Sequence, residues 1–238
     1  MPRMRRLIVP SVLALLAVSA AGRPADASLI LNPPAPSFPD IASGVLTDKL
    51  SYTYDPSTQT GQFQMTNRPA SITAATASYD IGADASGIRS EVLGLTLDKA
   101  GNLLSSGNNS FSLNGSIDAG GQHFSGVLLT GTPTQFGWAP PDPINNAGSA
   151  TFDLNMKITG GLLQNFYGPD AYMRIDTVMQ STFQGRFDQS FFATKPLTNT
   201  RAYHSPQPFP IPEPTTLVVV LIGGAGVTYR HRRRLLTA

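Results

Sequence analysis

The chain has 238 residues and no cysteine, and charged residues make up 13% of it, about half the share of an ordinary soluble domain. The lack of cysteine excludes disulfides, thiolate zinc sites, a cysteine nucleophile and lipid attachment at a lipobox cysteine. The formal net charge is +2, but residues 28–213 contain nine basic and fourteen acidic side chains, a net charge of −5. The basic groups in excess therefore lie at the two chain ends, and nucleic-acid binding is not expected.

Residues 1–27 have the layout of a secretory signal peptide. They begin with basic MPRMRR, continue with apolar LIVPSVLALLAVSAA and end in small residues. Ala25 and Ala27 supply the A-x-A pattern, so we place the cut after Ala27, with cuts after Ala20 or Ala21 as alternatives. An uncleaved anchor helix is the other interpretation, disfavoured by the proline that interrupts the apolar run. The protein is predicted to be exported.

Residues 28–195 are predicted to form one β domain. In LSYTYDPSTQTGQFQMTN, apolar and polar residues alternate on both sides of a turn predicted at Asp55–Gly61, which indicates a hairpin. EVLGLTLDKAGNLLSS, with a turn at Asp98–Asn102, and SFSLNGSI repeat the pattern, as do TFDLNMKITGG, AYMRIDTVMQ and STFQGRFDQSFFA. In TFDLNMKITGG, Asp153 is expected on the face opposite to Phe152. Nine to eleven short strands and no helix of 12 residues predict an all-β fold, a single antiparallel β-sandwich or jelly roll.

The stretch KPLTNTRAYHSPQPFPIPEP, which starts at Lys195, contains six prolines and shows no apolar alternation. Proline removes an amide donor and favours extended chain. Residues 196–211 are therefore predicted to be a semi-rigid linker.

The last part of the chain, 212–234, has three components. Pro212, Glu213 and Pro214 are followed by the apolar run Thr215–Tyr229, which is 15 residues long, or about 22 Å as a helix against roughly 30 Å for a hydrocarbon core. A basic cluster at 230–234 then favours the cytoplasmic side of a membrane; its arginines are Arg230, Arg232, Arg233 and Arg234. A simple membrane anchor and a buried helix with a basic tip are the general interpretations of such a tail.

In this order, the three components resemble the PEP-CTERM sorting signal of exopolysaccharide-producing Gram-negative and related bacteria. A Gram-positive sortase signal has the same layout but requires Leu-Pro-x-Thr-Gly, and a GPI signal does not end in arginines. The resemblance covers about 25 residues. It implies that an exosortase, a membrane-embedded cysteine transpeptidase, cuts the chain near Pro212–Pro214 while the tail is in the cytoplasmic membrane. The protein would then be released, or attached at the envelope or matrix.

Catalytic motifs are sparse between the two signals. His123 and His204 are the histidines outside the tail, no G-x-S-x-G elbow accompanies them, and neither a zinc site nor a phosphate-binding loop is indicated. We therefore predict no enzyme activity and no cofactor. Two weaker alternatives are calcium binding near the turns and a glycosidase that uses a pair of carboxylates. The acidic residues available for such a pair are Glu91, Asp98, Asp153, Asp170 and Asp176.

Trp138 is the single tryptophan and lies beside Phe136 and a proline-rich stretch. We expect it to plug the end of the β domain, and the alternative is a platform on which a sugar ring stacks. The sequence thus supports two hypotheses: a structural, adhesive or polysaccharide-binding protein of the cell surface or matrix, and a secreted hydrolase acting on polysaccharide. Two carboxylates about 5 to 10 Å apart in an aromatic cleft would favour the hydrolase.

Overall fold

The computed structural model describes residues 28–30, 39–44, 49–74, 77–139, 149–177 and 181–203. The predicted signal peptide, the sorting signal and the part of the predicted linker after Tyr203 lie outside the described residues. The described residues form β1 (Asp40–Ser43), β2 (Lys49–Asp55), β3 (Thr60–Asn67), β4 (Pro69–Ala74), β5 (Ala77–Asp80), β6 (Ser90–Asp98), β7 (Ser110–Ala119), β8 (Gln122–Ala139), β9 (Ala150–Gly160), the short helix α1 (Gln164–Tyr167), β10 (Asp170–Thr177), β11 (Phe191–Thr194) and β12 (Pro196–Ala202).

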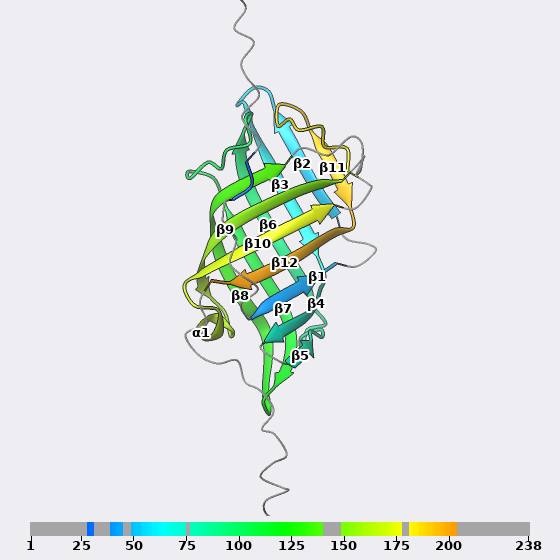
Figure 1. Ribbon diagram of the computed structural model, residues 1–238, viewed down its shortest axis with the longest axis vertical. Coiled ribbons are helices and arrows are strands. Elements are labelled where there is room, and N and C mark those ends of the chain that lie inside the picture. Colours follow the sequence, from blue (N-terminus) through cyan, green and yellow to red (C-terminus); the bar gives the residue numbers. More distant parts are fainter. Residues whose placement is uncertain are drawn as a thin grey trace, which may run out of the picture.

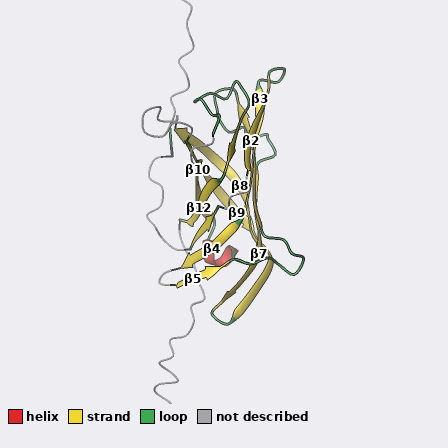
Figure 2. Ribbon diagram, turned by 90° about the vertical axis from the view of Figure 1, so that its right-hand side faces the viewer, coloured by secondary structure: helices red, strands yellow, loops and turns green. Residues whose placement is uncertain are grey.

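All of these strands belong to one antiparallel sheet, in the order β11-β2-β3-β6-β7-β8-β9-β10-β12-β1-β4-β5. The sheet curls into two layers. The strands β2, β3, β6 and β7 cross behind the strands β9, β10, β12, β1, β4 and β5 (Figure 1), and the side view shows the two layers (Figure 2). β8 joins the layers, because Gln122–Gly131 pairs with β7 and Thr130–Ala139 pairs with β9. The prediction of an all-antiparallel β domain is confirmed. The expected sandwich or jelly roll would have two separate sheets. Here the two layers belong to one curled sheet, because the long strand β8 takes part in both layers.

The predicted first hairpin is confirmed as β2–β3. Leu50 and Tyr52 of β2 and Phe63 and Met65 of β3 are buried, while the residues between them are exposed. Asp55 fixes the turn, because its Oδ1 accepts hydrogen bonds from the Ser57 amide at 2.8 Å and the Ser57 hydroxyl at 2.7 Å. The alternation of the sequence thus gives the inward and outward faces of these strands directly.

The space between the layers is filled by one apolar core with a cluster of phenylalanines at its centre. Phe152 of β9 is fully buried and stacks on Phe136, with ring centroids 6.0 Å apart. It also contacts Phe63 of the other layer edge-on at 5.3 Å. Phe183 and Phe187 complete the cluster. They lie in STFQGRFDQSFFA, which was predicted as a strand; this is wrong for residues 181–190, because the strand begins at Phe191. Packing of these rings replaces regular pairing there.

β12 corrects the predicted linker. Pro196–Ala202 pairs with β10 on one side and with β1 on the other, so it lies inside the sheet. Pro196 is tolerated because it is the first residue of the strand. The inward side chains include Thr198 and Thr200, which are buried although they are polar. The side chains of β12 therefore alternate between inward and outward, but polar threonines occupy inward positions, so the sequence shows no apolar pattern.

A buried polar cluster connects β6 with β12 across the core. Glu91 is fully buried and accepts hydrogen bonds from the Thr198 hydroxyl at 2.6 Å and the Thr200 hydroxyl at 3.2 Å. Asn67 of β3 donates to Thr198 Oγ1 at 3.2 Å, and the Tyr167 hydroxyl of α1 donates to the Thr200 carbonyl at 3.0 Å. A buried carboxyl group requires such partners, because transfer from water without them is strongly unfavourable.

Candidate functional site

A pocket opens where β8 leaves β7. Pairing with β7 ends at Gly131, so the second half of β8 has β9 on one side and an open edge on the other. A pocket of about 600 Å³ lies along this edge, within the size range of small-ligand sites. It is lined by Ser28, Leu29, Ile30, Ala100, Gly101, Asn102, Leu103, Thr134, Gln135, Phe136 and Trp138. We call this the edge pocket.

The turn predicted at Asp98–Asn102 is confirmed and forms one wall of the edge pocket. Asp98 Oδ1 accepts hydrogen bonds from the Ala100 amide at 2.8 Å and the Asn102 amide at 2.9 Å. Gly101 has a φ of 86°, a left-handed conformation that favours glycine. A Cβ at Gly101 would lie 3.0 Å from Trp138 Nε1. The glycine therefore lets the turn approach the indole closely.

Trp138 forms the floor of the edge pocket and is 7% exposed. Its ring meets Phe183 and Phe187 edge-on, with both centroid distances 5.4 Å. This burial agrees with the expected structural plug and leaves no open ring face on which a sugar would stack. None of the described residues accepts a hydrogen bond from the indole N–H, which lies beside Gly101. Trp138 thus packs as part of the core and presents no stacking surface to the pocket.

The opposite wall of the edge pocket consists of residues 28–30, which directly follow the predicted signal-peptidase cut. The Trp138 amide donates to the Ser28 carbonyl at 3.3 Å. The Ile30 amide donates to both carboxylate oxygens of Asp153, at 3.2 Å and 3.1 Å. Residues 28–30 are therefore tied to both β8 and β9.

Asp153 was predicted to point outward from β9, and it is indeed on that face, but it is only 1% exposed. Residues 28–30 cover it, and the Tyr172 hydroxyl of β10 also donates to Asp153 Oδ2 at 3.2 Å. Burial raises the pKa of Asp153 above its ordinary value, although the hydrogen bonds from Ile30 and Tyr172 act in the opposite direction. Gly137, directly opposite on β8, leaves the room for this arrangement.

We expect Gly137→Ala to displace residues 28–30 from the edge pocket. A Cβ at Gly137 would lie within 3.0 Å of Asp153 Oδ1, the Ser28 carbonyl oxygen and the Ile30 nitrogen. Fluorescence of Trp138 measures the change, because it is the only tryptophan: its emission should shift to longer wavelength and become more accessible to acrylamide. Gly94→Ala on β6 is the matched control, because its Cβ would meet ordinary contacts, the nearest at 3.6 Å. Identical spectra for both variants would contradict the close packing.

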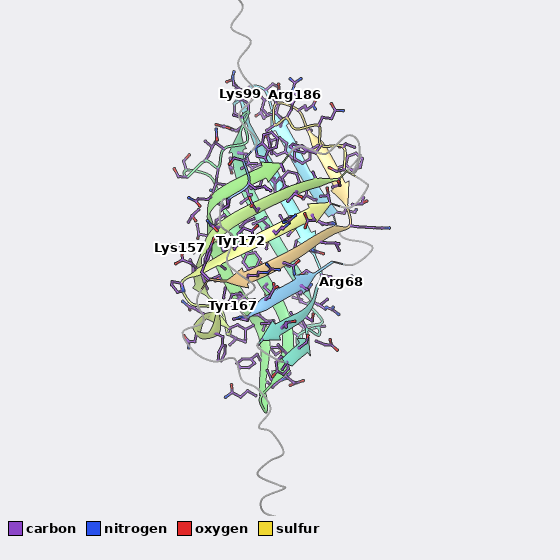
Figure 3. All side chains as sticks on the ribbon, viewed as in Figure 1. Arg68, Lys99, Lys157, Tyr167, Tyr172 and Arg186 are labelled. Carbon is purple, nitrogen blue, oxygen red and sulfur yellow. The ribbon has the colours of Figure 1, made fainter. Side chains whose placement is uncertain are left out.

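A second pocket of about 370 Å³ adjoins the first. It shares Thr134 and Gln135 with the edge pocket, and its other lining residues are Asn155, Met156, Lys157, Asp170 and Tyr203. We call it the side pocket. Figure 3 shows Lys157 on the left-hand flank of the molecule, below the upper end at which Lys99, a residue of the Asp98–Asn102 turn, is labelled. Lys157 Nζ is 2.6 Å from Asp170 Oδ1, so the charged groups of this pocket form an ion pair.

The carboxylates named as candidates for a glycosidase pair are not brought together in either pocket. Glu91 lies in the buried polar cluster, Asp98 holds its own turn and Asp153 is covered by residues 28–30. Asp170 alone lines a pocket, paired with Lys157, and Asp176 accepts hydrogen bonds from Arg174.

His123 lies at the tip of the β7–β8 hairpin, with its Nδ1 2.6 Å from Asp118 Oδ1, and lines neither pocket. His204, the sorting motif Pro212–Pro214, and Ala25 and Ala27 of the predicted cleavage site lie outside the described residues. Within the described ranges, no three histidine or carboxylate side chains lie close enough together to hold a metal ion. No helix in the same ranges is long and apolar enough to cross a membrane, and Thr215–Tyr229 lies outside them.

Sequence reasoning singled out Trp138 and Asp170 and predicted the Asp98–Asn102 turn, but it did not predict the pockets that these residues line. Thr134 and Gln135 carry no motif, and they line the pockets because the strand is irregular at that point. Comparison of the chain with protein-family models, with curated proteins and with solved structures gives no match.

Proposed function

We propose that the protein is an exported surface or extracellular-matrix protein that binds neutral polysaccharide in the edge pocket and has no catalytic role. The observation that carries this proposal is the lining of the pocket. Its described residues combine amide and hydroxyl groups with aromatic and aliphatic side chains, and none of them is acidic or basic. Sugars present hydroxyl groups and apolar ring faces, which such a lining satisfies without a charged partner.

The placement of the carboxylates supports binding over hydrolysis. A glycosidase requires two carboxyl groups on either side of the bond that is cut. In the part of the chain that the structure describes, no carboxyl group lines the edge pocket and one, Asp170, lines the side pocket, where it forms an ion pair with Lys157. A hydrolase acting on polysaccharide remains the second hypothesis from the sequence, and no arrangement of the described carboxylates favours it.

Binding is tested by titration of the protein with neutral oligosaccharides, following Trp138 fluorescence. The panel contains two- and six-unit chains of β-1,4-linked glucose, β-1,4-linked N-acetylglucosamine and α-1,6-linked glucose. We expect saturable changes with at least one series, and about tenfold weaker binding for Gln135→Ala, which corresponds to one lost hydrogen bond of roughly 1.4 kcal/mol. Gln62→Ala on β3, outside both pockets, is the matched control. Absence of binding across the panel would overturn the proposal, and release of reducing sugar would favour the hydrolase.

Delivery to the surface or matrix is proposed from the two ends of the sequence. The signal peptide directs export, the run Thr215–Tyr229 holds the chain in the cytoplasmic membrane, and the following arginines stop its transfer. An exosortase then cuts near Pro212–Pro214, where the prolines keep the backbone extended and accessible to the enzyme.

Replacement of Pro212-Glu213-Pro214 by three alanines is expected to leave an uncut precursor in the membrane. The reason is that the exosortase recognises this tripeptide, while the membrane-spanning run and the arginines are unchanged. The measurement is the mass and location of the protein in a host that carries an exosortase. A matched control replaces Pro206 and Pro208 with alanine and is expected to be processed normally. Secretion of the triple-alanine variant at the mass of the processed wild-type protein would contradict the sorting proposal.

A further inference from the structure

The edge pocket and the side pocket meet at an irregularity in β8. The register between β8 and β9 shifts between Pro133 and Gln135, so Thr134 is not paired in register with a residue of β9, although its hydroxyl donates to the Asn155 carbonyl at 3.2 Å. Such a bulge bends a strand and re-aims its side chains. Thr134 and Gln135 line both pockets as a result. A ligand that fills one pocket therefore reaches side chains that also belong to the other.

The boundary between the pockets is fixed by hydrogen bonds. Asn155 Nδ2 donates to Gln135 Oε1 at 2.7 Å, and the Tyr203 hydroxyl donates to Asn155 Oδ1 at 2.7 Å. These bonds orient the Gln135 amide. Among the described residues, none accepts a hydrogen bond from the Gln135 side-chain nitrogen. Preorganised polar groups of this kind bind a ligand with a smaller loss of side-chain entropy.

The charges along both pockets favour a neutral ligand. Among the lining residues that the structure describes, the edge pocket has no charged side chain, and the side pocket has one cation and one anion, which form a pair. A charged ligand would have to compete with the partner already in place, whereas hydroxyl groups can share hydrogen bonds with an ion pair without breaking it.

From this continuity we infer that the two pockets are consecutive subsites of one groove, which binds an extended stretch of a neutral polysaccharide chain rather than a single sugar or a chain end. The inference rests on the proposed function, and adds that the ligand is a polymer whose neighbouring units occupy the edge pocket and the side pocket together. Tyr203, Asn155 and Lys157 are then binding residues of the second subsite.

The test compares two- and six-unit chains of the oligosaccharide series that binds best, by calorimetry with the wild-type protein and with Tyr203→Ala. We expect the wild type to bind the six-unit chain at least tenfold more tightly than the two-unit chain. Tyr203→Ala should reduce this gain to less than threefold; because the gain is the ratio of the two affinities, a change at Gln135 that weakens both lengths equally does not alter it. Tyr54→Ala on β2, which also replaces a partly buried tyrosine but lines neither pocket, should keep the full gain.

Lys157→Ala provides a second variant if Tyr203→Ala does not fold, because the Lys157 side chain is 60% exposed and its removal leaves the core intact. It should reduce the gain with chain length in the same way. Equal affinity of the wild type for both lengths, or a full gain in both subsite variants, overturns the two-subsite inference while the proposed function stands. A protein that binds neither length overturns both.

Discussion

A chain of residues 28–195 is expected not to fold cooperatively, whereas a chain of residues 28–203 is expected to fold. The shorter chain lacks β12, so β10 and β1 each lose a partner in the middle of the sheet. It also removes the hydroxyl groups of Thr198 and Thr200 from Glu91, which leaves a buried carboxyl group without these partners. We expect this combined loss to exceed the net stability of an ordinary domain, which is only about 5 to 15 kcal/mol.

The two chains are compared by urea denaturation, followed by circular dichroism and Trp138 fluorescence. We expect one cooperative transition for residues 28–203 and no cooperative transition for residues 28–195. Two similar transitions would show that β12 is dispensable and would return Pro196–Ala202 to the role of a linker.

Glu91→Ala is expected to destabilise the protein by about 3 kcal/mol or more. Two buried hydroxyl groups lose their acceptor, at about 1 to 3 kcal/mol each, and a cavity forms next to them. Glu91→Gln should lose less, because its amide oxygen still accepts one of the hydrogen bonds. The free energy of unfolding is measured by chemical denaturation.

The control for Glu91→Ala is Asp118→Ala, which removes an acidic side chain that is 86% exposed and paired only with His123 at the surface. It should change the free energy of unfolding by less than about 1 kcal/mol. Equal effects of the two substitutions would contradict a structural role for the buried carboxyl group.

The predictions from sequence were accurate where apolar alternation and turn residues agree. The β2–β3 hairpin and the turn at Asp98–Asn102 are local features, and their residues carry the full signal. β12 was missed because its inward side chains include threonines. These are buried because they donate hydrogen bonds to Glu91, which lies 107 positions before Thr198 in the chain. The covering of Asp153 was missed for the same reason, since the amide that binds it belongs to Ile30, 123 residues earlier.

The sequence by itself determined the all-β character of the domain and predicts its export and sorting, because strand alternation, signal peptides and sorting signals are all written in consecutive residues. Only the tertiary structure decided that β8 joins two layers of one sheet, and that its bulge, the Asp98–Asn102 turn and residues 28–30 enclose a pocket. The physical reason is that each wall is an ordinary local element, and the pocket exists only because the curled sheet brings elements that are distant in the chain to one open edge.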